Sequence, residues 1–181
     1  MINRVQNNKG FTLIELLLGM AIILILASGS YVGYIRFNKQ QNVNIARDNL
    51  VNTLIEARSN AISQVITTLP PAGCKQASRT LIGNQVWFDT TTDPHSYLIQ
   101  EVCSDGINPY YTPTVKRISL AQGISFQSTP GFVRFRVATG EVATPTTVIV
   151  KVKGSSNPSE WRTICVNLAG VIRTIKGSET C

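Results

Sequence analysis

Apolar and polar residues follow three different patterns along the chain. Residues 11–35 are apolar almost throughout, with one acidic residue, Glu15, among 25, and this length suffices for a helix that spans a bilayer. Beyond this run, apolar residues recur every three or four positions, as on one face of a helix, at Val43, Ala46, Leu50, Leu54, Ala57, Ala61 and Val65. The first prolines are Pro70 and Pro71, so the pattern predicts one helix over residues 11–68.

After residue 70 the pattern changes to short alternating stretches separated by turn residues. Alternation is clearest in FVRFRVA (132–138) and TTVIVKVK (146–153). The other predicted strands are residues 80–88, 96–102, 115–120, 124–128, 161–167 and 170–176. Such alternation is typical of antiparallel sheet with one wet face, and no second helical pattern exists to connect parallel strands. The sequence therefore predicts an α+β fold, in which a long N-terminal helix packs on a C-terminal antiparallel β-sheet domain.

Residues 9–18, KGFTLIELLL, join a basic leader to the apolar run. A carboxylate inside an apolar segment is costly, so Glu15 requires a specific role. An ordinary secretory signal is cut behind its apolar core, whereas the candidate site here, Gly10, precedes the run and would leave it in the mature chain. The decapeptide resembles the type IV prepilin signature, with Gly10 at the processing site, Phe11 as the new N-terminus and Glu15 as its fifth residue.

This resemblance implies a pilin fold and a maturation pathway. It divides the chain into a leader peptide (1–10), a transmembrane and filament-core helix (11–35), an amphipathic continuation of the helix (36–69) and a β-rich globular pilin domain (70–181). A prepilin peptidase/methylase is expected to cut between Gly10 and Phe11 and to N-methylate Phe11. In a filament of pilin or pseudopilin subunits, the carboxylate of Glu15 would then pair with the N-terminal amine of a neighbour.

The resemblance also implies a location. The protein is expected in the bacterial inner membrane as a single-pass protein with an external C-terminal domain, and afterwards in an extracellular or periplasmic filament. Arg4 and Lys9 before the apolar run favour this orientation, whereas Arg36 and Lys39 beyond it weaken the charge difference.

The C-terminal half is most similar to the GspH/FimT/FimU group, which comprises H-type pseudopilins of type II secretion and minor pilins. The similarity covers ARSNAISQ (57–64) and the order of parts: many short strands, a penultimate strand, a Gly turn and a basic last strand. DNA-binding members carry Gly-Arg-x-Arg in the last turn. Here the segment reads Gly170-Val171-Ile172-Arg173, without the first arginine.

Two functions follow from this resemblance, and they share the membrane anchor. The first is a structural subunit, a minor pilin or pseudopilin, of a type IV pilus or a type II secretion filament. The alternative is a tip-located subunit that captures DNA or a surface through Arg134, Arg136, Lys151, Lys153, Arg173 and Lys176. Charged residues on an edge strand also prevent aggregation, so we favour that simpler role for Arg173 and Lys176. The sequence does not decide between pilus and pseudopilus, nor between major and minor subunit.

Charge and motif content narrow the function classes further. Lys and Arg number 17 against 10 Asp and Glu, and loss of Arg4 and Lys9 with the leader lowers the net charge from +7 to +5. This surplus permits contact with nucleic acid without requiring it. No catalytic set can be assembled around the single histidine, His95, and no HExxH, P-loop or GxGxxG motif occurs. We therefore predict no enzymatic activity, no cofactor and no metal site, with His95 solvated in a turn.

The four cysteines form no CxxC pair, which favours disulfide bonds over a metal site in an exported chain. Four cysteines allow three connectivities, and the sequence alone does not select one. We expect Cys165 to pair with Cys181, because a turn at Gly170 lets the tail fold back. We expect Cys74 to pair with Cys103, which would tie the segment after the helix to a strand.

Overall fold

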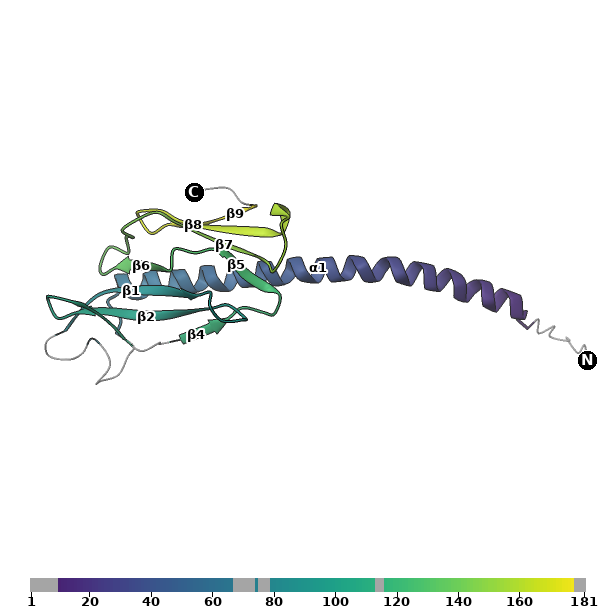
Figure 1. Ribbon diagram of the computed structural model, residues 1–181, viewed down its shortest axis with the longest axis horizontal. Helices are drawn as coiled ribbons and strands as arrows, with labels where there is room; N and C mark the ends of the chain where they lie inside the picture. The colour runs from purple at the N-terminus through teal and green to yellow at the C-terminus, as the bar shows by residue number, and fades with distance from the viewer. Residues whose placement is uncertain (1–9, 67–73, 75–78, 113–115, 178–181) are drawn as a thin grey trace, which may run out of the picture. The chain divides into compact units, whose positions relative to one another are not determined.

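The computed structural model describes residues 10–66, 74, 79–112 and 116–177, and of residues 27–32 it describes the backbone alone. The chain forms two compact units, Met1–Asn38 and Lys39–Cys181. One helix, α1 (Leu13–Ile62), has helical backbone throughout and contributes residues to both units (Figure 1).

In the first unit, the described large apolar side chains of α1 are exposed, Leu24 for example by 70%. No helical stretch among the described residues is both long and apolar enough to count as a membrane span. The span expected at residues 11–35 includes residues 27–32, whose side chains lie outside the description.

The helix ends earlier than the sequence predicts. It stops at Ile62, and Gln64 adopts a left-handed conformation with φ of 53°. The N–H of Gln64 donates to Ala61 O at 3.3 Å, and that of Val65 to Asn60 O at 2.9 Å. These two bonds form a Schellman motif, which closes a helix without any proline. The predicted continuation to residue 68 is therefore wrong, and the Pro70-Pro71 stop lies outside the described residues.

The described strands of the second unit form two antiparallel sheets, where the sequence analysis expected one. The first sheet has the order β3-β2-β1-β6, with β4 also paired to β2: β1 (Thr80–Asp89), β2 (Ser96–Ser104), β3 (Pro109–Tyr111), β4 (Lys116–Ser119) and β6 (Phe132–Arg136). The second sheet has the order β5-β7-β8-β9: β5 (Ile124–Ser128), β7 (Thr146–Val152), β8 (Trp161–Val166) and β9 (Ile172–Lys176). A short 3₁₀ turn, η1 (Pro158–Glu160), precedes β8.

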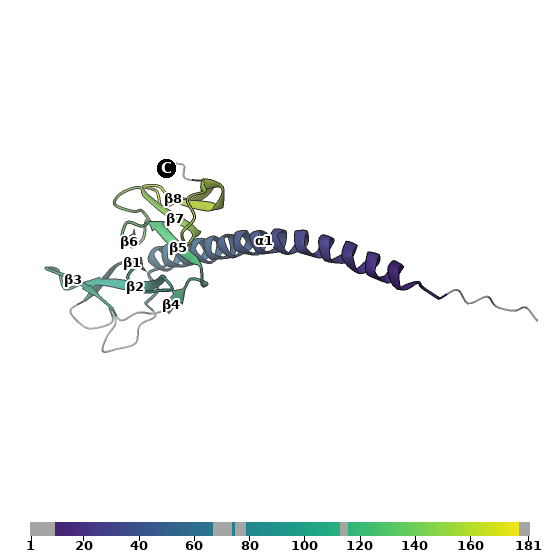
Figure 2. The ribbon, with the colours of Figure 1, turned by 45° about the vertical axis from the view of Figure 1, so that its right-hand side comes forward.

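The second half of α1, residues 39–62, supplies the centre of the core. Figures 1 and 2 both show the first sheet on one side of this segment and the second sheet on the other. Six of the seven predicted stripe residues are buried, from Val43 to Ala61, together with apolar residues of both sheets. Val65 is 41% exposed, because the helix has already ended before it. The helix and the antiparallel strands give the α+β fold that the sequence predicts.

Two arginines hold the second sheet to this helix segment. Arg162 on β8 is buried, and its Nε donates to Asn44 Oδ1 at 2.7 Å. Its burial lowers the pKa of the guanidinium. Arg58 donates from Nη2 to Ala169 O at 3.3 Å, in the turn between β8 and β9.

Glycine is required in that same turn. Gly170 has φ of 72°, and a Cβ placed on it would overlap the carbonyl oxygen of Gly140 and crowd Arg58 Nε. Only glycine combines this backbone conformation with so close an approach of two chain segments. A turn is thus present at Gly170, as the sequence predicts, and it packs closely against Gly140 and against Arg58 near the end of α1.

Candidate functional site

The predicted processing site lies at the start of α1. Gly10 is exposed, Phe11 is 83% exposed, and neither residue is helical. Thr12 is the N-cap, because its carbonyl accepts from Leu16 N at 3.2 Å and its Oγ1 from Glu15 N at 3.4 Å. Thr12 and Glu15 have the T-x-x-E spacing of a capping box, a local signal that the sequence analysis missed.

Glu15 therefore has a role within its own helix. It lies in the first turn, where a carboxylate interacts favourably with the positive end of the helix dipole. Among the residues that the structure describes, no ion pair to its carboxylate is found. Its pairing with the amine of a neighbouring subunit remains a prediction.

The six basic residues proposed for DNA capture are divided between the two sheets. Arg134 and Arg136 lie on β6 of the first sheet, whereas the other four lie on or beside the second sheet: Lys151, Lys153, Arg173 and Lys176. Side chains three positions apart in a strand point to opposite faces, so Arg173 and Lys176 diverge. The alternating pattern thus identifies which residues face solvent without indicating that they belong to different sheets.

Two of the lysines are engaged within the domain. Lys153 Nζ forms an ion pair with Asp93 Oδ2, which joins the second sheet to the β1–β2 loop and lowers the pKa of Asp93. Lys151 Nζ lies 5.4 Å from the centroid of the Trp161 ring and donates to Ser155 O at 3.3 Å.

His95 is not the solvated residue that the sequence analysis expects. The backbone N–H of Phe126 donates to His95 Nδ1 at 3.1 Å, and the two rings stack with centroids 5.9 Å apart. The histidine thereby connects the start of β2 with β5, and hence the two sheets. Within the described part of the chain, no group of three or more His, Cys, Asp or Glu is placed to hold a metal ion.

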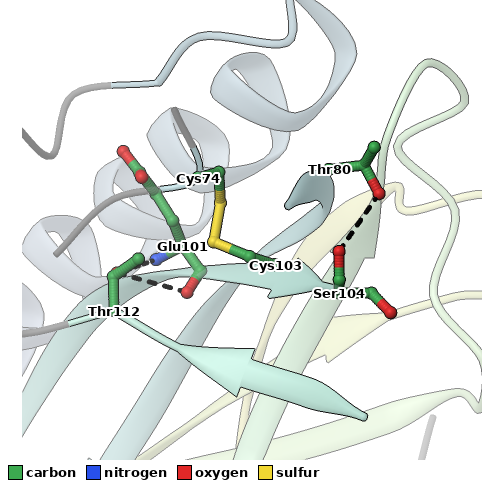
Figure 3. The surroundings of a disulfide bond; sticks show 6 residues. All are labelled: Cys74, Thr80, Glu101, Cys103, Ser104 and Thr112. Atoms are coloured by element: carbon green, nitrogen blue, oxygen red, sulfur yellow. Dashed lines mark hydrogen bonds between the residues drawn. A yellow bond between two sulfur atoms is a disulfide. The ribbon is translucent and has the colours of Figure 1, made fainter. Parts of the chain in front are cut away.

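One predicted disulfide is present. Cys74 and Cys103 are bonded, with Cα atoms 5.4 Å apart, and this bond attaches a buried residue of the post-helix segment to β2 (Figure 3). Thr112 stabilises the same part of β2, since its Oγ1 accepts from Glu101 N at 3.0 Å. Cys165 lies on β8, and no described cysteine is free, but Cys181 of the expected Cys165–Cys181 pair lies outside the described residues.

The chain is similar to known proteins at its N-terminus and in its fold. The family described as the prokaryotic N-terminal methylation motif matches residues 5–31. No curated protein matches the chain in sequence. Two crystal forms of the type IV minor pilin FimU of Pseudomonas aeruginosa are similar at 17% identity, with TM-scores of 0.54 and 0.50. They cover 80% and 76% of this chain, and 98% of the FimU chain in each case.

A third solved structure is the minor pseudopilin EpsH from the type II secretion system of Vibrio cholerae. It is 16% identical with a TM-score of 0.49, over 78% of this chain and 99% of that one. The chain thus carries the N-terminal methylation motif at residues 5–31, and it shares the fold of the minor pilin FimU.

Proposed function

We propose that the protein is a structural subunit, a minor pilin or pseudopilin, of a type IV pilus or a type II secretion filament. One observation carries the proposal. The methylation motif at residues 5–31 overlaps the start of a helix whose described apolar side chains, to residue 26, are exposed. An exposed apolar surface of this extent marks a site of contact with a membrane or with other proteins.

Maturation would proceed in two steps. A prepilin peptidase/methylase cuts between Gly10 and Phe11, both exposed and outside the helix, and methylates the new amine. The apolar helix then anchors the chain in the inner membrane until the subunit enters the filament. Burial of a large apolar side chain such as Leu24 against neighbouring helices contributes about 1.5–3 kcal/mol, which favours assembly.

Mass spectrometry of the protein from its native host tests the processing step. We expect a mature N-terminus at Phe11, N-methylated, with residues 1–10 absent. A chain that retains Met1, or one cut downstream of Ala27, would exclude a pilin-type maturation.

Replacement of Glu15 tests the assembly step. Glu15→Leu lengthens the apolar run, so membrane insertion should be retained or improved. Incorporation into filaments should fall, because the carboxylate that pairs with a neighbouring amine is lost. The control is Glu56→Leu, which removes an exposed carboxylate that lies 3.7 Å from Lys116 Nζ within the domain. Equal incorporation of the two variants would show that Glu15 acts only at its own helix start.

The alternative function, DNA capture, is tested on the unit that begins at Lys39. The six basic residues lie on two sheets and Lys153 is ion-paired, so we expect no salt-dependent retention of duplex DNA by this unit. Retention that falls steeply with salt would restore the alternative.

A further inference from the structure

The face of the first sheet that points away from α1 carries a shallow pocket of about 500 Å³. Its floor follows one row of register partners across four strands. Trp87 on β1 pairs with Leu98 on β2 and with Phe132 on β6, and Leu98 in turn pairs with Arg117 on β4. Trp87 and Leu98 therefore form an apolar floor, with the Phe132 ring at one edge and the Arg117 guanidinium at the other.

A second row of side chains closes one side of this pocket. Gln85 and Gln100 are also register partners, and Gln85 Nε2 donates to Gln100 Oε1 at 3.1 Å. Arg134 donates from Nη2 to Gln85 Oε1 at 3.2 Å and to Tyr111 OH at 3.1 Å. Its guanidinium lies 5.1 Å from the Phe132 ring centroid and 5.6 Å from that of Tyr111. These contacts hold the pocket wall in one arrangement before any ligand arrives.

Arg117 is the cation that lines the pocket, and it is fixed from one side. Its Nη1 donates to Asp89 Oδ2 at 3.2 Å and to Ser96 Oγ at 3.0 Å, while its side chain remains 50% exposed. Hydrogen bonds from Thr91, and a smaller contribution from Arg117, lower the pKa of Asp89, so this carboxylate stays charged. Nε and Nη2 of Arg117 have no partner among the described residues, and an Arg fork of this kind binds a carboxylate in a bidentate manner.

We propose that this pocket binds an acidic sugar residue of a polysaccharide. The carboxylate of a uronic acid would pair with Arg117, and the C–H face of the sugar ring would lie on Trp87 and Phe132. Its hydroxyls would meet the amide of Gln100 and the phenol of Tyr111. A pocket that combines an apolar floor with a few fixed polar groups is the usual form of a small-molecule site.

The arrangement suits a sugar better than a nucleic acid. Binding of single strands relies on several phosphate contacts along a track and on exposed rings for base stacking. Here a single cation lines the pocket among the described residues. Arg134 beside the pocket already donates to Gln85 and Tyr111, so these hydrogen bonds compete with any contact it could make to a phosphate.

Calorimetric titration of the full chain in detergent micelles with a galacturonic acid oligomer tests the proposal. The matched ligand is the methyl-esterified oligomer, which has the same sugar rings without the negative charges. We expect saturable binding of the acidic oligomer and at least about tenfold weaker binding of the ester, because charge-assisted hydrogen bonds are lost. Arg117→Gln should weaken binding of the acid to the same extent, and Phe132→Ala by about threefold to tenfold.

Two variants of the second sheet and its turns serve as controls. Arg173→Gln removes the same charge, and Leu168→Ala removes an apolar side chain that is also exposed, so both should bind within about twofold of wild type. Thermal unfolding verifies that each variant is folded. No binding by wild type, equal binding of the ester, or an equal loss in Arg173→Gln would overturn the proposal. Arg117-dependent binding of an oligothymidylate in place of the sugar would assign the face to nucleic acid instead.

Discussion

The two halves of α1 use the same kinds of apolar residue in opposite ways. Leu24 in the first half is exposed by 70%, whereas Leu50 in the second half is fully buried among strands of both sheets. The apolar residues of the second half are thus accounted for within the chain itself, because they pack into the core of the domain. The first half has no such explanation within the described chain, and its apolar residues indicate an environment that other molecules must supply.

The largest effect that tests this comparison comes from the same substitution made in each half. Leu50→Ala opens a cavity in the core and should lower the free energy of unfolding by about 2–5 kcal/mol. Leu24→Ala removes an exposed side chain of the first unit and should leave this value unchanged. Urea unfolding followed by the fluorescence of Trp87 and Trp161, both in the domain, measures it. Equal losses would mean that the first half also stabilises the domain.

The disulfide provides a second test of the difference between the two halves of α1, because both of its cysteines lie in the second unit. Replacing Cys74 and Cys103 by Ser releases a loop with a sequence separation of 29, which should cost about 2–4 kcal/mol. The helix content of the whole chain should not change, and circular dichroism in micelles measures it. An unchanged unfolding midpoint would show that the bond adds nothing to the stability of the domain.

A substitution at Gly170 tests the close packing of the β8–β9 turn against Gly140 and against Arg58 near the end of α1. Gly170→Ala should lower the free energy of unfolding by more than the roughly 1–2 kcal/mol that a positive φ costs, because its Cβ also overlaps Gly140. Gly123→Ala is the matched control, with φ of 79° and open space around the added methyl. Denaturant unfolding of both variants separates backbone strain from steric overlap. If Gly170→Ala were as stable as Gly123→Ala, the close approach of Gly170 to Gly140 would be contradicted.

The smallest expected effect concerns pH. The folded pKa of Asp93 lies below its ordinary value of 3.8, because Lys153 donates a hydrogen bond to it and attracts its charge. The ion pair therefore contributes stability above about pH 4, and this contribution is lost as pH falls through the folded pKa. Asp93→Asn should reduce the dependence of the unfolding midpoint on pH between 4 and 2, as measured by urea titration at each pH. An unchanged slope would leave the other carboxylates as its source.

The sequence predicts local features of this fold better than distant ones. The helical stripe and all but one of the strands follow from periodicity, which each segment carries in itself. The missed strand, β3, has three residues and begins with a proline. The helix end escaped notice because Gln64 occupies a position at which glycine or asparagine is usual.

Partners that lie far apart in the sequence account for the remaining errors. Alternation in β6 shows which of its side chains are buried, but it does not show that β6 pairs with β1 while β5 pairs with β7. The sequence therefore does not predict the division into two sheets. For the same reason it does not predict that the basic residues are divided between them. His95 was misjudged for the same reason, since its donor, Phe126, lies 31 positions away. The pocket of the first sheet also depends on this pairing, because its floor comes from four strands.

The cap at Thr12 determines what removal of residues 1–10 would change. The first bonds of the helix run from Glu15 and Leu16 to Thr12, so a cut before Phe11 would break none of them. What would change is charge: a new ammonium, positive at neutral pH, would appear beside the positive end of the helix. Glu15 carries the opposite charge in that same turn and would offset it. Leader removal would thus act on this helix as an electrostatic event, with its conformation already in place.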